Sequence, residues 1–384
     1  MRLLNLIASG LLAATLLLAA CSDPQEDPAV DNSSARFSVA QLLGGGNTEG
    51  YVRAYAPRPF VFPADHGPHP GYRQEWWYFT GNLATPEGRR FGFQLTFFRT
   101  ALTPAPAARA SAWATNQAYM AHFTLSDIDA GRFHAFERFS RAALGLAGAS
   151  VQPFRVWLED WSAQGTGDDA ALPMRLRAAQ DGVAIDLSLD SLKPPVLQGD
   201  RGLSQKGPAP GNASYYYSLT RMPTHGTVRI GSRSFPVEGL SWMDREWSTS
   251  ALSGDQVGWD WFALQLSDGR ELMFYQMRRR DGSADPFSSG VLVQAEGASR
   301  RLALQEVELR VAGHWQSPRS GARYPSRWTI RIPAEELELE VVPHLAGQEL
   351  DLAVRYWEGA VQVRGNAQGR PVTGQGYVEL TGYD

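Results

Sequence analysis

Two tryptophan-rich segments constrain the fold of this chain more than any other feature. Each has the length and apolar pattern of a strand, and each leads through a Gly-Arg turn into a second apolar segment that ends in arginine. Each pair therefore reads as a β-hairpin. The first copy comprises residues 75–83, 88–89 and 91–99, and the second comprises residues 259–266, 269–270 and 272–278. Two similar hairpins in one chain indicate a duplicated unit.

A closing signature also occurs twice. A Pro-Val-x-Gly turn is followed by an aromatic residue, one intervening residue and an acid. The signature lies at residues 236–239 and 242–244, and again at residues 371–374 and 377–379. Because the opening and closing signatures recur in the same order, we predict two domains, 51–249 and 250–384. Other strand-length segments separated by Gly, Asp, Asn and Pro predict an all-β fold class.

The matching ends of each unit predict how its sheet is arranged. An antiparallel unit that begins and ends in similar strands suits an up-and-down barrel, which pairs the first strand with the last and leaves no edge. We therefore expect residues 75–80 to lie beside residues 242–247. A barrel of about eight strands has room inside for one small ligand.

The N-terminus has the pattern of a bacterial lipoprotein. An apolar run over residues 3–20 follows Arg2 and ends in small residues before Cys21, the single cysteine of the chain. This pattern predicts a signal peptide over residues 1–20 and lipidation of Cys21. Residues 21–50 are rich in polar residues, Pro and Gly and read as a tether. We expect the protein on the periplasmic side of the envelope, anchored in a membrane and, since Ser22 follows the cysteine, in the outer membrane.

Charge and composition exclude some partners. The 384 residues include 36 basic and 40 acidic ones, for a net charge of -4, and no basic stripe is present. Nucleic acid is therefore not an expected partner. No Gly-x-Ser-x-Gly nucleophile motif occurs, and His66 and His69 read as turn histidines rather than as a metal site. We expect neither a metal nor a cofactor.

Several motifs together resemble the AttH-like family, which also contains the carotenoid hydratases. They lie at residues 75–83, 242–247, 258–262, 356–359 and 376–383. The resemblance implies two tandem lipocalin-like antiparallel β-barrels. It also implies a range of activities, because the family includes secreted hydrolases, proteins encoded near ABC transporters, and enzymes that add water to apolar polyenes.

Alternation along the strands suggests where chemistry resides. Trp242, Asp244 and Glu246 share one face of a strand, and Glu75 and Trp77 share one face of another. A carboxyl buried among indoles has a raised pKa and can donate a proton, which hydration of a C=C bond requires. The candidate acids are Asp244, Glu246, Glu75 and Asp260. The candidate ligand-binding residues are Trp77, Trp242, Trp259, Trp261, Tyr78, His122 and Tyr217.

A structural role is the alternative for several of these residues. One end of a lipocalin barrel is commonly closed by a tryptophan packed against an arginine, a role that Trp77 with Arg245, or Trp261 with Arg355, could fill. Glu75 and Glu246 would then be ion-pair partners of arginines at the rim. Two functions remain open at this point. One is a carrier of a lipid or isoprenoid ligand that works with an ABC transport system. The other is a cofactor-free hydratase or hydrolase that uses a buried carboxylic acid.

Overall fold

The computed structural model describes residues 37–38, 47–105, 111, 113–167, 171–250 and 252–383. Within these residues the regular elements are strands and three short 3-10 helices, η1 (Ala64–His66), η2 (Leu304–Glu306) and η3 (Pro333–Glu335). The predicted all-β fold class is confirmed. No helix in this part of the chain has the length and apolar character needed to cross a membrane. The predicted signal peptide and the lipidation site Cys21 lie outside the described residues.

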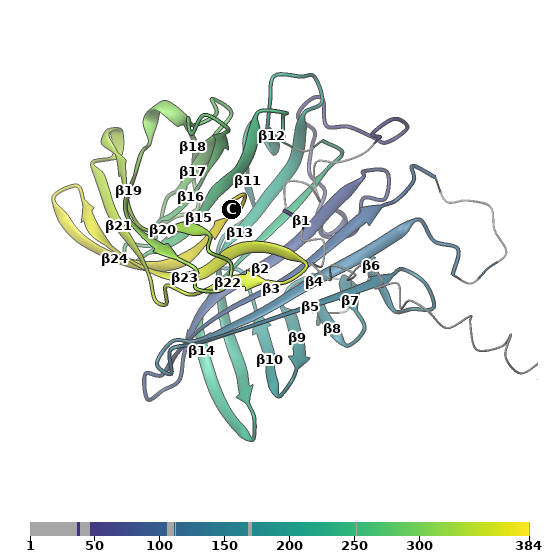
Figure 1. Cartoon of the computed structure of the whole chain (residues 1–384), viewed down its shortest axis with the longest axis horizontal. Coiled ribbons are helices and arrows are strands. Elements are labelled where there is room, and N and C mark those ends of the chain that lie inside the picture. Colours follow the sequence, from purple (N-terminus) through teal and green to yellow (C-terminus); the bar gives the residue numbers. More distant parts are fainter. Residues whose placement is uncertain are drawn as a thin grey trace, which may run out of the picture. The chain divides into compact units, whose positions relative to one another are not determined.

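The strands of the first half form one antiparallel sheet, coloured purple to teal in Figure 1. Its strand order is β5-β4-β3-β2-β14-β13-β10-β9-β8-β7-β6, with β11 and β12 also pairing to β13. The strands are β2 (Gln74–Ala84), β3 (Arg90–Ala101), β4 (Gln117–Asp127), β5 (Arg132–Arg141), β6 (Ala147–Ser150), β7 (Arg155–Leu158), β8 (Trp161–Gly165), β9 (Met174–Gln180), β10 (Val183–Leu189), β11 (Val196–Leu197), β12 (Leu203–Gln205), β13 (Ala213–Ile230) and β14 (Arg233–Ser248).

The second half repeats this arrangement in a second sheet, coloured green to yellow in Figure 1. Its order is β18-β17-β16-β15-β24-β23-β21-β20-β19, with β22 antiparallel and the short β1 parallel to β23. The strands are β1 (Phe37–Ser38), β15 (Gln256–Leu266), β16 (Glu271–Arg279), β17 (Ser289–Val293), β18 (Ser299–Ala303), β19 (Glu308–Gln316), β20 (Arg323–Ile332), β21 (Leu337–Pro343), β22 (Glu349–Asp351), β23 (Val354–Ala367) and β24 (Arg370–Leu380).

The register of the strands confirms the expected pairing of opening and closing strands. In the first sheet β2 pairs with β14, placing Glu75 opposite Trp247 and Thr80 opposite Trp242. In the second sheet β15 pairs with β24 in the same manner. Each sheet is open at one place. The edge strands of the first sheet are β5 and β6 and those of the second are β18 and β19, and in each case the two edge strands are consecutive in sequence but do not pair. The two sheets therefore share one topology.

The same register shows that the repeat extends to individual positions. Leu83 lies opposite Gly239 in the first sheet, and Leu266 lies opposite Gly374 in the second. Five residues further along each closing strand, Asp244 lies opposite Tyr78, and Glu379 lies opposite Trp261. Asp244 and Glu379 are thus equivalent positions of the two repeats.

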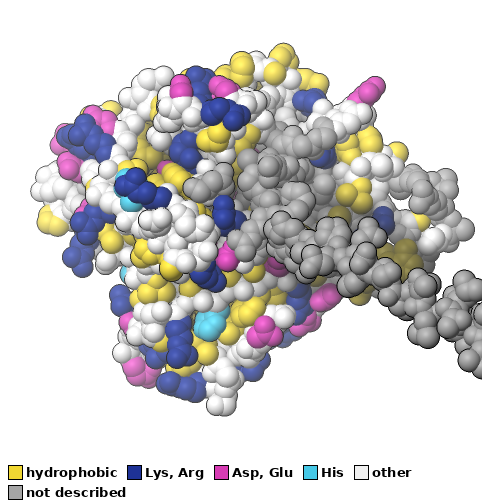
Figure 2. All heavy atoms as spheres, in the orientation of Figure 1, with side chains coloured by type: hydrophobic (Ala, Val, Ile, Leu, Met, Phe, Trp, Pro, Cys, Tyr) yellow, Lys and Arg dark blue, Asp and Glu magenta, His cyan; other side chains and the backbone are white. Residues whose placement is uncertain are grey.

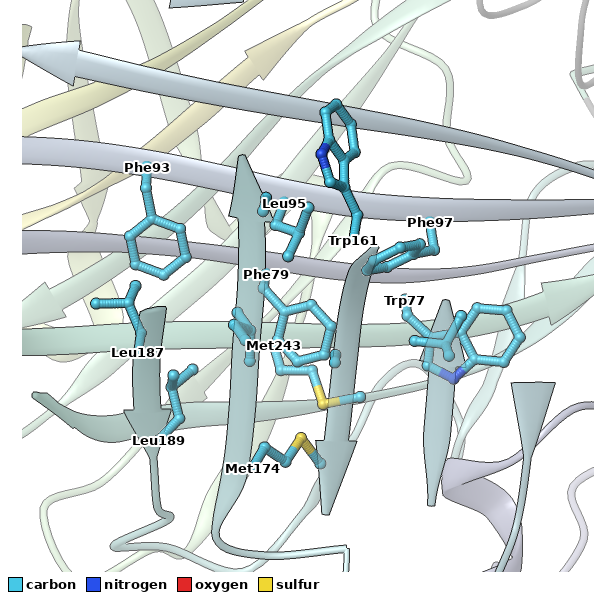
Figure 3. Packing of buried hydrophobic residues seen from close by; sticks show 14 of the residues in the cluster. Trp77, Phe79, Phe93, Leu95, Phe97, Trp161, Met174, Leu187, Leu189 and Met243 are labelled. Atoms are coloured by element: carbon cyan, nitrogen blue, oxygen red, sulfur yellow. The ribbon is translucent and has the colours of Figure 1, made fainter. Parts of the chain in front are cut away.

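The first sheet curls around a filled apolar core. Phe123 on β4 meets Trp161 on β8 edge-to-face at 5.7 Å, although these strands lie in the two outer parts of the strand order. Figure 3 shows Trp77, Phe79 and Met243 within this interior. A side-chain hydrogen bond also links the edge strand β5 to the other half of the sheet, since Arg138 of β5 donates to the Gln180 side chain of β9 at 2.9 Å. The barrel interior is therefore a packed core.

The second sheet has its own core. Phe262 of β15 and Trp328 of β20 pack edge-to-face at 5.5 Å, and Trp328 also contacts Trp357 of β23 at 6.5 Å. Ion pairs cross the open place of this sheet, where Arg300 on β18 contacts Glu335 of η3 at 2.8 Å. The structure thus contains two successive antiparallel barrels, as expected.

The outer faces of the two sheets are buried against each other around β2, β14, β15 and β24. Asn82 donates to the carbonyl of Gly376 at 3.0 Å, and Gln265 donates to the carbonyl of Ser241 at 2.9 Å. Gly92 permits this approach, since a Cβ there would lie 2.6 Å from the Cβ of Ala360. Strands at the junction are therefore buried on both faces, and a second set of aromatic and acidic side chains lies between the sheets.

The face shown in Figure 2 is mixed in charge. On the face shown in Figure 2, Lys and Arg side chains lie interspersed with Asp and Glu side chains over the described residues. Both lysines of the chain instead lie at the junction of the sheets, where Lys193 contacts Glu271 at 2.8 Å and Lys206 contacts Glu246 at 3.2 Å.

Candidate functional site

A cavity lies between the outer faces of the two sheets. The first sheet contributes Trp76 and Tyr78 of β2, Tyr216 of β13, and Asp244 and Glu246 of β14. These residues alternate with the core residues of the first barrel, so they point away from it. The cavity is therefore formed by both repeats and lies outside either barrel.

The second sheet forms the opposite wall. Trp259 and Trp261 of β15, Tyr275 of β16, Tyr356 of β23 and Glu379 of β24 all line the cavity. Seven of the ten lining residues named for the two walls are Trp or Tyr, and six of these seven belong to, or pack against, one buried cluster that joins the sheets. The walls are thus mostly aromatic, with acids placed among the rings.

Asp244 is a buried acid of the first wall. Its side chain is 4% exposed and accepts hydrogen bonds from Ser218 Oγ at 2.5 Å, from Trp242 Nε1 at 2.7 Å, and from the Tyr216 hydroxyl. Trp261 Nε1 in turn donates to the Tyr216 oxygen at 3.2 Å. These donors are its side-chain hydrogen-bond partners among the described residues, and none carries a charge.

The surroundings of Asp244 change its acidity. Burial raises the pKa of Asp244 to about 7, even though the three donated hydrogen bonds lower it. A carboxyl with this pKa is partly protonated at neutral pH, so it can supply a proton and later take one back.

Glu246 has a different environment from that of Asp244. It lies 3.2 Å from Nζ of Lys206 and accepts a hydrogen bond of 2.5 Å from Ser214 Oγ. Burial lowers the pKa of Lys206, but the charge and hydrogen bond of Glu246, together with Tyr275 and Asp244, raise it overall. Glu246 and Lys206 therefore form an ion pair at the edge of the cavity, and Glu246 is less suited than Asp244 to donate a proton.

Two further acids, Glu358 and Glu379, face each other across β23 and β24. Tyr78 donates to Glu358 at 2.7 Å, and Trp259 Nε1 donates to Glu379 at 2.6 Å. Burial and the neighbouring charge of Glu379 raise the pKa of Glu358 well above its usual range, and burial also raises the pKa of Glu379. Two adjacent buried carboxyls without a cation cannot both ionise readily, so the pair retains a proton near neutrality.

His122 acts on the cavity through Tyr356. Its Nδ1 lies 2.7 Å from the Tyr356 hydroxyl, which also accepts a hydrogen bond of 2.9 Å from Gln94. On its other side, Nε2 lies 3.7 Å from the Glu137 carboxylate. Burial lowers the pKa of His122, so the neutral ring shares a hydrogen bond with the Tyr356 hydroxyl. His122 orients a lining residue without itself forming the wall.

Comparison with known proteins agrees with this architecture. The model of the AttH-like family matches residues 53–383. This chain belongs to the AttH-like family. A solved structure assigned to AttH from Nitrosomonas europaea shares 36% sequence identity and a TM-score of 0.76, covering 85% of this chain and 99% of that one.

Two comparisons point to kievitone hydratase. The enzyme of that name from Fusarium solani subsp. phaseoli is 22% identical over 244 residues, which is 62% of this chain and 68% of that protein. The solved structure of kievitone hydratase from Nectria haematococca is 16% identical with a TM-score of 0.67, covering 87% of this chain and 96% of that one. At 16% identity, the similarity to this solved structure shows a shared fold only.

Among the predicted acids of this AttH-like chain, Glu75 lies away from the cavity. It is fully buried in the mouth of the first barrel, where it pairs with Arg99 and Arg245. Although burial opposes ionisation, the two arginines hold the pKa of Glu75 well below its usual range. Glu75 is therefore ionised and structural, and we correct its assignment as a proton donor.

Asp260 also faces away from the cavity. It lies on the opposite face of β15 from Trp259 and Trp261, where it contacts Arg278 Nε at 2.9 Å and accepts a hydrogen bond of 2.9 Å from Tyr383. Burial raises the pKa of Asp260 despite these contacts. Asp260 is thus held by Arg278 and Tyr383 and does not line the cavity, so the prediction that it is an acid of the site is also corrected.

The predicted aromatic residues divide between the two faces of the first sheet. Trp77 packs under Arg245, whose guanidinium carbon lies 4.0 Å from the ring centroid, so the structural alternative holds for this tryptophan. Tyr217 also faces the first barrel, 2.6 Å from Nδ1 of His66. Tyr78, Trp242, Trp259 and Trp261 instead belong to the junction between the sheets. Tyr217 and Trp77 are thus corrected as ligand-binding residues.

His66 and His69 are packed rather than displayed on a surface turn. Nε2 of His69 lies 2.9 Å from Asp65, and its ring stacks on Trp247 at 3.7 Å. Together with η1 they fill the mouth of the first barrel. No group of three or more potential metal-ligating side chains occurs in the described part of the chain.

Sequence reasoning did not select Tyr216, Lys206, Glu358 and Glu379. The repeat held the signal for Glu379, because the closing signature aligns it with Asp244. Tyr216 adjoins the selected Tyr217, and only the register of β13 decides which of the two faces the cavity. Glu358 and Lys206 had no comparable signal in the sequence.

Proposed function

We propose that this chain is a hydratase that adds water to a C=C bond of an apolar, isoprenoid-like substrate held between the two sheets. The observation that carries the proposal is Asp244, a carboxyl buried among aromatic rings with a pKa raised to about 7 and no charged hydrogen-bond partner among the described residues. Such a group is suited to protonate carbon at neutral pH.

The arrangement accounts for each step of a hydration. The protonated Asp244 carboxyl transfers its proton to one alkene carbon and becomes a carboxylate, while the other alkene carbon becomes a cation. The aromatic rings and the new carboxylate stabilise this cation. A water molecule then forms the new C–O bond, and the proton that it loses returns to Asp244. The net change is the addition of one water, and the carboxyl is restored.

Hydrogen bonds keep the Asp244 carboxyl ready for both roles. Ser218 and Trp242 donate to one oxygen and Tyr216 to the other, so the carboxylate formed by proton transfer is stabilised without a cation. Burial disfavours that same charge, and the balance leaves the pKa near the working pH. Kievitone hydratases, which share the family fold and distant sequence similarity, support the proposed reaction type.

The test is whether the purified protein incorporates water into an alkene. Kievitone and a linear carotenoid polyene would be incubated with the protein in heavy-oxygen water, and the products analysed by mass spectrometry. We expect a product that has gained one water bearing the heavy label. If every probe is recovered unchanged although it binds in the cavity, the hydratase proposal is overturned and the carrier proposal is favoured.

The second proposed function is carriage of a lipid or isoprenoid ligand, for which the aromatic lining of the cavity is the supporting observation. In this alternative the protein is anchored through Cys21 on the periplasmic side of the envelope and works with an ABC transport system. Mass spectrometry of lipids extracted from the purified protein distinguishes the two, because a carrier returns its ligand chemically intact.

A further inference from the structure

The cavity between the sheets carries more acid than base. Asp244 and Glu246, which are each 4% exposed, and Glu379, which is intermediate, line the cavity. The fully buried Glu358 does not line it but pairs with Glu379 across β23 and β24. Lys206 is the basic residue among the lining side chains, and Glu246 is its partner. The remaining three carboxyls have no ion-pair partner among the described residues.

Beside the cavity, one oxygen of Glu358 lacks a hydrogen-bond donor in the described part of the chain. Oε2 of Glu358 is buried and has no hydrogen-bond donor among the described residues, while Oε1 accepts from Tyr78. The Glu358–Glu379 pair retains a proton near neutrality, and a positive charge beside Glu379 would favour its ionisation.

The aromatic walls already hold one cation. Nζ of Lys206 lies 4.3 Å from the ring centroid of Tyr275 and 5.4 Å from that of Tyr216. These distances are within the range of cation–π attraction, which is strongest where water is excluded. Trp259 and Trp261 line the same cavity, so aromatic surface extends beyond the rings that Lys206 occupies.

The two repeats place acid on opposite walls. Asp244 of β14 and Glu379 of β24 are equivalent positions, and both face the cavity from their own sheet. A ligand between the sheets therefore meets carboxyl groups from both sides and aromatic rings along its length. Neutral and anionic ligands gain nothing from this pattern of charge.

We propose that this cavity preferentially binds apolar organic cations, namely an ammonium or related onium group carried on a hydrocarbon chain. The positive group lies between Asp244 and Glu379, and the chain packs along the tryptophan and tyrosine side chains. The same arrangement would stabilise the carbocation of an alkene hydration, so the inference deepens the proposed function. Cation binding itself does not depend on catalysis.

Binding should respond to pH because the acids must ionise to attract a fixed positive charge. The charged and titratable groups around Asp244 and Glu379 are Tyr78 of β2, Lys206 after β12, Tyr216 of β13, Glu246 of β14, Tyr275 of β16, and Tyr356 and Glu358 of β23. Burial raises the pKa of Asp244 to about 7. Affinity for a permanently charged ammonium therefore rises with pH between about 6 and about 8, and the cation promotes ionisation of the carboxyl.

The experiment compares three ligands with one chain length and different head groups. Octyltrimethylammonium, octanol and octanoate would be titrated below micellar concentrations into the purified protein, with tryptophan fluorescence and calorimetry as readouts. At about pH 8 we expect the ammonium to bind at least about tenfold more tightly than the alcohol and more tightly still than the carboxylate. The preference should shrink at about pH 5.

Charge-neutralising variants test the placement of the cation. Asp244→Asn and Glu379→Gln keep the shape of the walls, and each should weaken ammonium binding about tenfold while leaving octanol binding unchanged. Glu238→Gln is the matched control, because Glu238 lies on the same strand as Asp244 but is exposed. It should leave all three affinities at the wild-type value.

The outcomes separate this inference from the proposed function. Equal affinities for the three ligands, or equal losses for all three in Asp244→Asn, would overturn the inference even if the protein hydrates alkenes. A clear ammonium preference in a protein that hydrates no probe would support the inference and overturn the hydratase proposal alone.

Discussion

Replacement of Asp244 by Asn should make the folded protein more stable at alkaline pH. Asparagine is the neutral analogue of the protonated carboxyl and fits the same hydrogen bonds. Its oxygen can accept from Ser218 and Trp242, and its amide can donate to the oxygen of Tyr216. The substitution therefore removes a buried charge without leaving an obvious unpaired group.

The magnitude follows from the acidity of the carboxyl. The pKa of Asp244 is raised from 3.8 to about 7 in the folded state. At about 1.36 kcal/mol per pKa unit, ionisation of this group costs the folded state about 4 kcal/mol at pH values above its folded pKa. Because the folded pKa is the higher one, this loss is absent below about pH 4 and develops as the pH rises to about 7. The variant avoids it and should gain about 2–4 kcal/mol at about pH 8.

Urea unfolding followed by tryptophan fluorescence at several pH values measures this difference. The free energies of unfolding of wild type and Asp244→Asn should agree within about 1 kcal/mol at about pH 4 and separate as the pH rises. A variant that is less stable than wild type at about pH 8, or a difference that does not change with pH, would refute the assignment of a raised pKa to Asp244.

Five other substitutions have distinct expected results. Glu75→Gln should lower the free energy of unfolding in urea by about 3 kcal/mol, because it leaves two buried arginines without their carboxylate. Tyr216→Phe should slow alkene hydration in the product assay by removing a donor to the acid, whereas Tyr217→Phe should cost about 1 kcal/mol of stability and leave the rate unchanged. Lys206→Met should strengthen octyltrimethylammonium binding in fluorescence titrations, since it removes the competing cation. Cys21→Ser should release the protein from the membrane fraction of the expressing bacterium if that cysteine is the lipid anchor.

The repeated signatures were sufficient to predict the arrangement of the strands. The similarity of residues 75–83 to 259–266, and of residues 242–244 to 377–379, predicted that opening and closing strands pair, and the register bears this out. The sequence therefore contained the topology and the equivalence of Asp244 and Glu379.

The alternation of side chains along the strands could not predict where the cavity lies. In an ordinary barrel strand one face is apolar and the other faces water, but β2 and residues 241–248 of β14 are buried on both faces. Trp77 and Trp76 are then indistinguishable in sequence, although one packs in the first barrel and the other lines the cavity. Only the packing of the second sheet on the first identifies the functional face.

The acids show the same limit. Glu75 and Asp244 both lie in tryptophan-rich strands. Two arginines from other strands keep Glu75 ionised, whereas burial keeps Asp244 partly protonated. Those arginines come from β3 and β14, so the charge state depends on contacts between strands. Residue type and spacing indicate a carboxyl, and the fold determines its pKa.

The most direct test of the account is the rate of alkene hydration by wild type and Asp244→Asn, measured side by side in heavy-oxygen water on a substrate that the wild type converts. If Asp244 is the proton donor, the variant should remain folded and lose activity by a factor of about 100 to 10,000, because it retains the cavity but has no acidic proton to give. A folded variant that forms labelled product at the wild-type rate would contradict the central claim.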